Sequence, residues 1–207
     1  MATLWLSIIH AVCQEAPVVI ADSRSPNGRM ELWIVPEKNE GIAVGTAEIR
    51  DVKIGRTLGT FDWSGFGTEA DKTAFKVLWR PDSKFFAISW EETRGWMTGT
   101  VFGISRNGKW NEIGLPKDEY TKAIMKLGGV SDLYGKGCET PLDWLANGDL
   151  ELEFMDRNLA YDHEDLEKEF IVELRVASRK DTPLSSGTIV SIRQKTKEQV
   201  EQELQSR

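Results

Sequence analysis

The sequence has few of the residues that most often carry out chemistry in proteins. Its 207 residues include two histidines, His10 and His163, and two cysteines, Cys13 and Cys138. Two histidines exclude a zinc site built from several histidine ligands. They also exclude a serine–histidine–aspartate arrangement unless His163 serves in it. The sequence therefore offers little support for the commonest metal and hydrolase centres.

The common nucleotide and hydrolase motifs are incomplete. Residues 129–133, Gly-Val-Ser-Asp-Leu, begin like a nucleophile elbow but lack its closing glycine. The glycine-rich stretches at 65–67 and 128–129 have no following Lys-Ser/Thr and are typical of turns, not of phosphate-binding loops. We expect no cofactor.

The charge and hydropathy of the chain exclude two classes of partner. Its formal net charge is −7, and no basic stripe is present that would neutralise phosphates. We therefore expect binding neither to nucleic acid nor to anionic membrane. No apolar run is long enough to span a bilayer, so no membrane span is expected.

A turn of similar chemistry recurs three times, each time before an apolar segment typical of a β-strand. In the second and third copies a tryptophan, Trp79 or Trp144, stands at the same offset before the turn. A unit returning after a fixed interval is typical of repeat and propeller sheets. The turns and the segments that follow are residues 25–29 with 30–34, 80–84 with 85–89, and 145–149 with 150–154.

The turns have the residues of hairpins: proline in the first two presets φ, asparagine or aspartate tolerates the next position, and glycine in the first and third allows positive φ. The alternating pattern predicts strands that bury one face, whereas residues 85–90 are apolar on both faces and indicate a central, covered strand. The predicted antiparallel pairs are residues 17–21 with 30–35, 74–79 with 85–90, and 143–145 with 150–154.

A second hairpin follows in every unit, so that each unit contains four antiparallel strands. The pairing of Trp-x-Pro-Asp-Ser-Lys at 79–84 with Asp-Val-Lys-Ile-Gly-Arg at 51–56 resembles the blades of WD40-like and TolB-like β-propellers. Such propellers usually close with four to eight blades. The resemblance implies a mainly β fold of three consecutive four-stranded blade-like sheets, as a partial propeller or a distorted sandwich. The second hairpins are 46–52 with 57–61, 100–104 with 109–113, and 170–176 with 188–193.

Two segments depart from the β pattern. Residues 116–127 carry apolar side chains at helical spacing and end at two glycines, which predicts a short helix between units two and three. Thr196 and Gln199 form a capping-box pattern that opens an amphipathic helix over 197–205. We therefore expect a single β domain over 14–193 and a helical tail over 194–207.

The first thirteen residues resemble a signal peptide. Residues 4–13 are apolar, Ala11-Val12-Cys13 has the character of a cleavage box, and Gln14 and Glu15 follow. No lysine or arginine precedes this stretch, and an N-terminal β-strand on a blade edge is the alternative. Export implies a periplasmic or secreted protein, and the strand implies a cytoplasmic one. If Cys13 is removed, Cys138 is alone and no disulfide framework exists.

One segment is dense in chemically active groups. Asp156, Asp162, His163 and Asp165 fall within residues 156–169, which are rich in carboxylates. Such oxygen ligands are able to hold Ca²⁺, and a carboxylate beside a histidine is able to do acid–base work. The spacing does not match an EF-hand loop, and a solvated acidic connection is the alternative.

Tryptophans and charged residues together suggest a binding surface. The chain has eight tryptophans against three tyrosines. Rings stack on ligands and carboxylates bind hydroxyls or amines, as in sugar- or peptide-binding surfaces. Trp79, Trp90 and Trp144 are instead expected in the blade core. The candidate ligand-binding residues lie in loop sequence and are Trp63, Glu91, Glu92, Arg94 and Trp96.

Three functions are compatible with these observations. The one we favour is a non-catalytic, exported interaction module that presents a surface to a protein or glycan partner. The second is a carboxylate-dependent hydrolase or lyase that uses residues 156–169 with His163. The third is a partial propeller that another chain completes.

The signal-peptide hypothesis predicts the N-terminus of the mature protein. N-terminal sequencing of the chain purified from its native host should find a start near Gln14, because the residues before it resemble a cleaved leader. An intact Met1 on the native protein would contradict export by this route.

Overall fold

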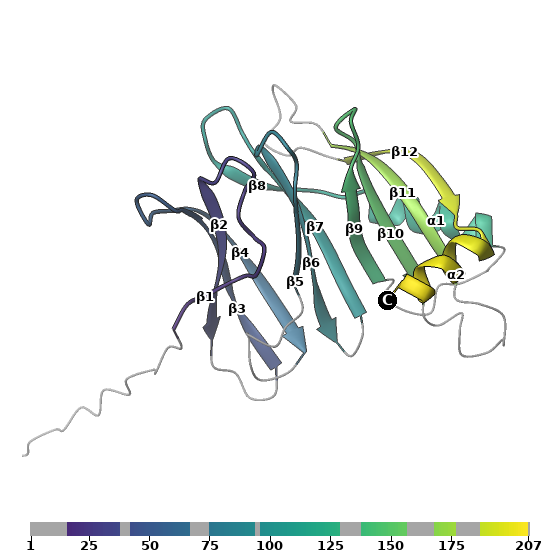
Figure 1. Ribbon diagram of the computed structural model, residues 1–207, viewed down its shortest axis with the longest axis horizontal. Coiled ribbons are helices and arrows are strands. Elements are labelled where there is room, and N and C mark those ends of the chain that lie inside the picture. The colour runs from purple at the N-terminus through teal and green to yellow at the C-terminus, as the bar shows by residue number, and fades with distance from the viewer. Residues whose placement is uncertain are drawn as a thin grey trace, which may run out of the picture.

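The computed structural model describes residues 16–37, 42–66, 75–93, 96–128, 138–156, 168–176 and 187–206. Within these ranges the chain forms three four-stranded antiparallel sheets, which follow one another from left to right in Figure 1. The expected mainly β fold of three consecutive sheets is confirmed.

Each sheet keeps its strands in chain order. The first sheet contains β1 (Val18–Val19), β2 (Met30–Glu37), β3 (Ile42–Asp51) and β4 (Thr57–Phe66). The second contains β5 (Phe75–Trp79), β6 (Phe85–Thr93), β7 (Trp96–Ile104) and β8 (Trp110–Ile113). The third contains β9 (Cys138–Trp144), β10 (Leu150–Asp156), β11 (Lys168–Val176) and β12 (Gly187–Gln194).

The predicted hairpins are confirmed, since within each sheet every strand pairs antiparallel with the next in the chain. Gly28 and Gly148 adopt φ of 68° and 85° in the first and third turns, the left-handed region that glycine enters without strain. Ser83 takes this place in the second turn with φ of 58°. Its hydroxyl accepts a hydrogen bond from the backbone N–H of Asn27 at 3.2 Å, which links the second turn to the first.

The sheets pack face to face around two apolar cores. The core between the first and second sheets contains Phe86 and Ile88, whereas the other core contains Phe85 and Ala87. Successive residues of β6 thus point to opposite cores, as the period of a strand requires. The prediction of a central strand covered on both faces is confirmed, because residues 85–90 are all buried.

The recurring tryptophan joins each sheet to the one before it. The indole N–H of Trp79 donates a hydrogen bond to the carbonyl of Ser23 at 2.8 Å, and that of Trp144 donates to the carbonyl of Leu78 at 3.0 Å. Each acceptor stands two residues before the turn of the preceding unit. The same bond is therefore made twice in equivalent register, and the turn repeat has a structural role.

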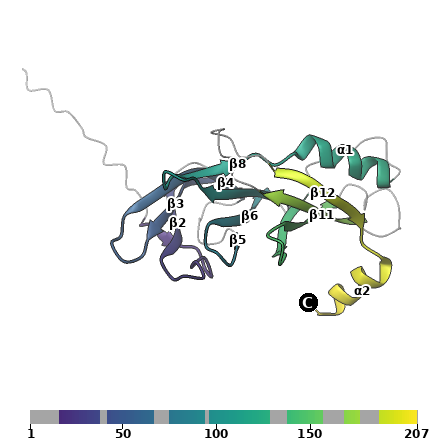
Figure 2. The same cartoon turned by 90° about the horizontal axis from the view of Figure 1, so that it is seen from above.

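Both predicted helices are present. Helix α1 (Lys117–Gly128) buries Tyr120 and Ile124 in the second core. Helix α2 (Lys197–Ser206) begins with the predicted capping box, in which Thr196 N–H donates to Gln199 Oε1 at 3.0 Å and Gln199 N–H donates to Thr196 Oγ1 at 3.3 Å. The two helices lie on opposite sides of the third sheet (Figure 2). Among the described residues, neither helix is long and apolar enough to cross a membrane.

The repeated tryptophan bond predicts a specific loss of stability. Trp79→Phe keeps an aromatic ring but removes the N–H that binds Ser23, so the free energy of unfolding should fall by about 1–2 kcal/mol. Urea denaturation measures this change. Trp33→Phe is the control, because Trp33 lies half-exposed on the first sheet. Equal losses in the two variants would contradict a role for the bond.

Candidate functional site

A cavity of about 310 Å³ lies between the first and second sheets. It is placed where β4 and β8, each the last strand of its sheet, come together. The first sheet contributes one aliphatic residue, one aromatic residue and two polar residues; the second contributes three aromatic and two polar residues. The lining residues are Ile49, Thr60, Phe61 and Asp62 from the first sheet, and Trp90, Thr100, Phe102, Trp110 and Glu112 from the second.

The aromatic wall of the cavity belongs to the core and is held on several sides. The ring of Phe61 lies 4.5 Å from that of Phe102 and 6.4 Å from that of Trp90, measured between centroids. The indole N–H of Trp90 donates to the carbonyl of Ser64 at 2.8 Å, which fixes its orientation. Trp110 packs edge-on against Trp79, with centroids 5.7 Å apart. The wall is thus already formed before any ligand binds.

The rim of the cavity is acidic. Asp62, Glu112 and Thr60 are exposed, and the hydroxyl of Thr100 donates to Glu112 Oε1 at 2.6 Å. None of the nine lining residues is a lysine, arginine or histidine. The combination of an aromatic wall and two carboxylates is suited to recognising hydroxyls or positively charged nitrogen groups.

The expected surface position of Trp63 is wrong. Its side chain is only 3% exposed, and its ring packs edge-on against Phe75 with centroids 5.4 Å apart. The reason is that β4 continues to Phe66, so alternation places Trp63 on the same inward face as Phe61. Loop sequence was expected there, but the strand is longer.

The charged connection between β6 and β7 is shorter than predicted. A loop over residues 91–95 was expected, yet Glu91 pairs with Met97 and Thr93 pairs with Trp96 in the ladder, with a bulge between Glu91 and Thr93. Backbone pairing therefore continues through the charged stretch. Glu91 is half-buried.

The other members of that candidate surface are not described. Arg94 and the side chains of Glu92 and Trp96 lie outside the described residues. Ligand binding by this group stays a prediction. The expected core positions of Trp79, Trp90 and Trp144 are confirmed, since each is at most 8% exposed.

The predicted metal site falls almost wholly outside the described residues. Asp162, His163 and Asp165 are not described, and of Asp156 only the backbone is, at the end of β10 opposite Lys168. Metal binding by these residues stays a prediction.

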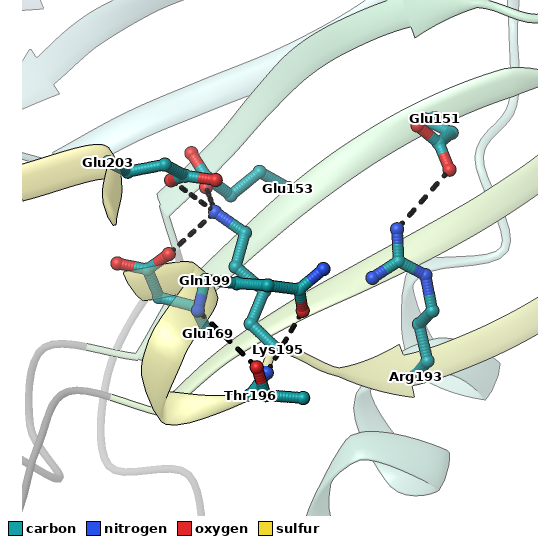
Figure 3. Close-up of polar contacts among 8 residues, drawn as sticks. All are labelled: Glu151, Glu153, Glu169, Arg193, Lys195, Thr196, Gln199 and Glu203. Atoms are coloured by element: carbon teal, nitrogen blue, oxygen red, sulfur yellow. Dashed lines mark hydrogen bonds and ion pairs between the residues drawn. The ribbon is translucent and has the colours of Figure 1, made fainter. Parts of the chain in front are cut away.

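A different acidic cluster joins α2 to the third sheet. Carboxylate oxygens of Glu153, Glu169 and Glu203 lie within 4.8 Å of one another. Figure 3 shows the ammonium group of Lys195 between them, with Nζ 2.7 Å from Glu169 Oε2 and 2.7 Å from Glu203 Oε2. Lys195 also donates to Glu153. Carboxylates from β10, β11 and α2 therefore share one cation.

The lysine fills the position that a metal ion would take. Lys195 is 8% exposed, and burial alone would lower its pKa, but its hydrogen bonds to Glu153, Glu169 and Glu203 outweigh burial and raise the pKa above the ordinary value. The ammonium group is therefore charged and offsets part of the negative charge of the three carboxylates. The role of the cluster is therefore to attach α2 to the third sheet.

A second buried cluster ties α1 to the second and third sheets. The Tyr120 hydroxyl donates a hydrogen bond to Glu139, whose other oxygen accepts from Lys117 Nζ at 2.6 Å and from Gly99 N–H at 3.3 Å. Burial raises the pKa of Tyr120, and the neighbouring Glu139 carboxylate raises it further. Tyr120 is fully buried, so the cluster offers a substrate no access to this hydroxyl.

Sequence reasoning missed the cavity, although a signal was present. Thr60-Phe61-Asp62 sets an aromatic residue between two polar ones, and Trp110 and Glu112 stand two apart on one strand face. Each pattern is common alone. Only the packing of β4 against β8 makes them one site.

No family model, curated protein or solved structure matches the chain. Any function assigned to it therefore depends on the residues described above.

The Lys195 cluster predicts a large and selective stability change. Lys195→Met leaves three carboxylates without their shared cation, so the free energy of unfolding should fall by about 3–5 kcal/mol. Thermal unfolding followed by circular dichroism measures it. The control is Lys197→Met, because the Lys197 side chain is 62% exposed and its nearest carboxylate lies at 3.9 Å. A loss as small as that of the control would contradict the structural role of Lys195.

Proposed function

We propose that the chain is a non-catalytic β-sheet module whose task is to bind a ligand in the cavity between its first two sheets. The observation that carries this proposal is the combination of a rigid aromatic wall with an acidic rim in a cavity of about 310 Å³. Ligand sites are typically concave and mostly preformed, with a few polar groups that fix orientation. The cavity has each of these properties.

We also propose a class of fold for the scaffold. We take the three sheets as blades of the WD40-like and TolB-like kind, in a partial propeller. Two features support this: each unit is a four-stranded antiparallel sheet in chain order, and equivalent tryptophans bind the preceding unit. Loops and strand edges of such scaffolds commonly carry binding sites because a rigid frame fixes them.

We also propose that the module is exported and acts in the periplasm or as a secreted protein. The apolar stretch over residues 4–13 and the following Gln14 and Glu15 support this location. The partner would then be a protein or a glycan of the periplasm or of the extracellular space.

The rim carboxylates provide the test. Asp62→Asn with Glu112→Gln removes both charges from the cavity with almost no change of shape, so binding should weaken by at least about tenfold. Binding is measured on a glycan array and a peptide array, with the intact chain as reference. Because Asp62 and Glu112 are exposed, the melting temperature of this double variant should stay close to that of the reference.

A matched control removes the same charge elsewhere. Glu119→Gln with Glu201→Gln changes two exposed carboxylates on α1 and α2, neither of which lines the cavity, and should bind normally. Equal loss in both double variants would contradict the cavity as the site. Cleavage of a bound probe, detected by mass spectrometry, would contradict a non-catalytic function and support the hydrolase alternative.

A further inference from the structure

We infer that the cavity recognises an organic cation whose charged group donates N–H hydrogen bonds, such as a guanidinium or a primary ammonium. This inference rests on the proposed function and specifies its ligand. It follows from the charge of the lining, from the balance of donors and acceptors, and from the size of the cavity.

The lining of the cavity is negatively charged, and none of its residues carries a positive charge. Asp62 and Glu112 are the two ionisable residues among the nine that line the cavity. A neutral ligand that covers the rim would bury these carboxylates without supplying an opposite charge, which is unfavourable. A cationic ligand supplies the missing opposite charge.

The lining side chains are almost all hydrogen-bond acceptors towards a ligand. The indole N–H of Trp90 already donates to the carbonyl of Ser64, and the hydroxyl of Thr100 already donates to Glu112. The N–H of Trp110 is buried without an acceptor among the described residues, so solvent does not reach it. Asp62 and Glu112 only accept.

This balance favours one class of ligand. A sugar hydroxyl needs donors as well as acceptors around it, and the unused side-chain donors of the lining are the hydroxyl of Thr60 and the buried N–H of Trp110, against two carboxylates that only accept. Guanidinium and ammonium groups only donate, so they match a lining of carboxylates. The aromatic wall adds attraction, because ring faces carry partial negative charge.

The size of the cavity sets an upper limit on the ligand. A volume of about 310 Å³ lies at the low end of the range for small-molecule sites. It accommodates one charged head group with its short carbon chain, and the rest of a larger ligand would lie outside the cavity. The occupant is therefore a small free cation or a single basic side chain of a larger partner.

The experiment compares two probes of equal shape and different charge. A five-residue peptide with arginine at its centre is titrated against the full chain beside the same peptide with citrulline, the neutral isostere of arginine. Binding is followed by heteronuclear NMR shifts of the indole N–H groups. We expect the arginine peptide to bind at least about tenfold more tightly, with an affinity that falls as salt rises.

Two variants locate the effect. Asp62→Asn with Glu112→Gln should remove the preference for arginine over citrulline, whereas Glu119→Gln with Glu201→Gln should retain it. Butylguanidinium is the second arm: if it binds as tightly as the arginine peptide, the ligand is a free cation, and if only the peptide binds, it is a basic side chain of a partner.

The possible failures are distinguishable. If citrulline binds as well as arginine, or if methyl glucoside shifts the Trp90 and Trp110 signals and arginine does not, the cation inference is overturned while ligand binding in the cavity stands. If no cationic or neutral probe shifts these signals, both the cation inference and the proposed ligand-binding function are overturned.

Discussion

The burial of the second sheet on both faces is the constraint on which the rest of the structure depends. In β6, Phe86 and Ile88 face one core and Phe85 and Ala87 the other, so one strand contributes to both. Burying each large side chain contributes about 1.5–3 kcal/mol, and losing one interface would expose apolar area on two sheets at once. The indole bonds of Trp79 and Trp144 then set the register in which the sheets meet.

The candidate site is a consequence of this packing. The rings of Phe61, Phe102 and Trp90 belong to the first core and also form the cavity wall, so the forces that stabilise the fold hold the site in shape. A site on core residues loses little conformational entropy on binding, because its side chains are already ordered. Its specificity is left to the exposed rim, where Asp62 and Glu112 can vary without disturbing the core.

The third sheet differs from the second, because only one of its faces is apolar and the other carries charged side chains. Glu153 and Glu169 are buried there by α2 and share an ion pair with Lys195, while the opposite face packs apolar side chains against the second sheet and α1. Helix α2 is short and weakly apolar, with Val200 buried, so the ion cluster and the Thr196–Gln199 cap are what attach and begin it.

The sequence by itself determined the local elements: the three turns, the hairpins, both helices and the two-sided strand at 85–90 follow from periodicity and turn chemistry, which act over a few residues. It misplaced Trp63 and the connection after Trp90, because strand length depends on the partner strand as well as on local residues. Only the tertiary structure decided which residues share the cavity and which carboxylates surround Lys195. Those groups come from strands and helices far apart in the chain, and their meeting is set by the packing of whole sheets, which no local pattern encodes.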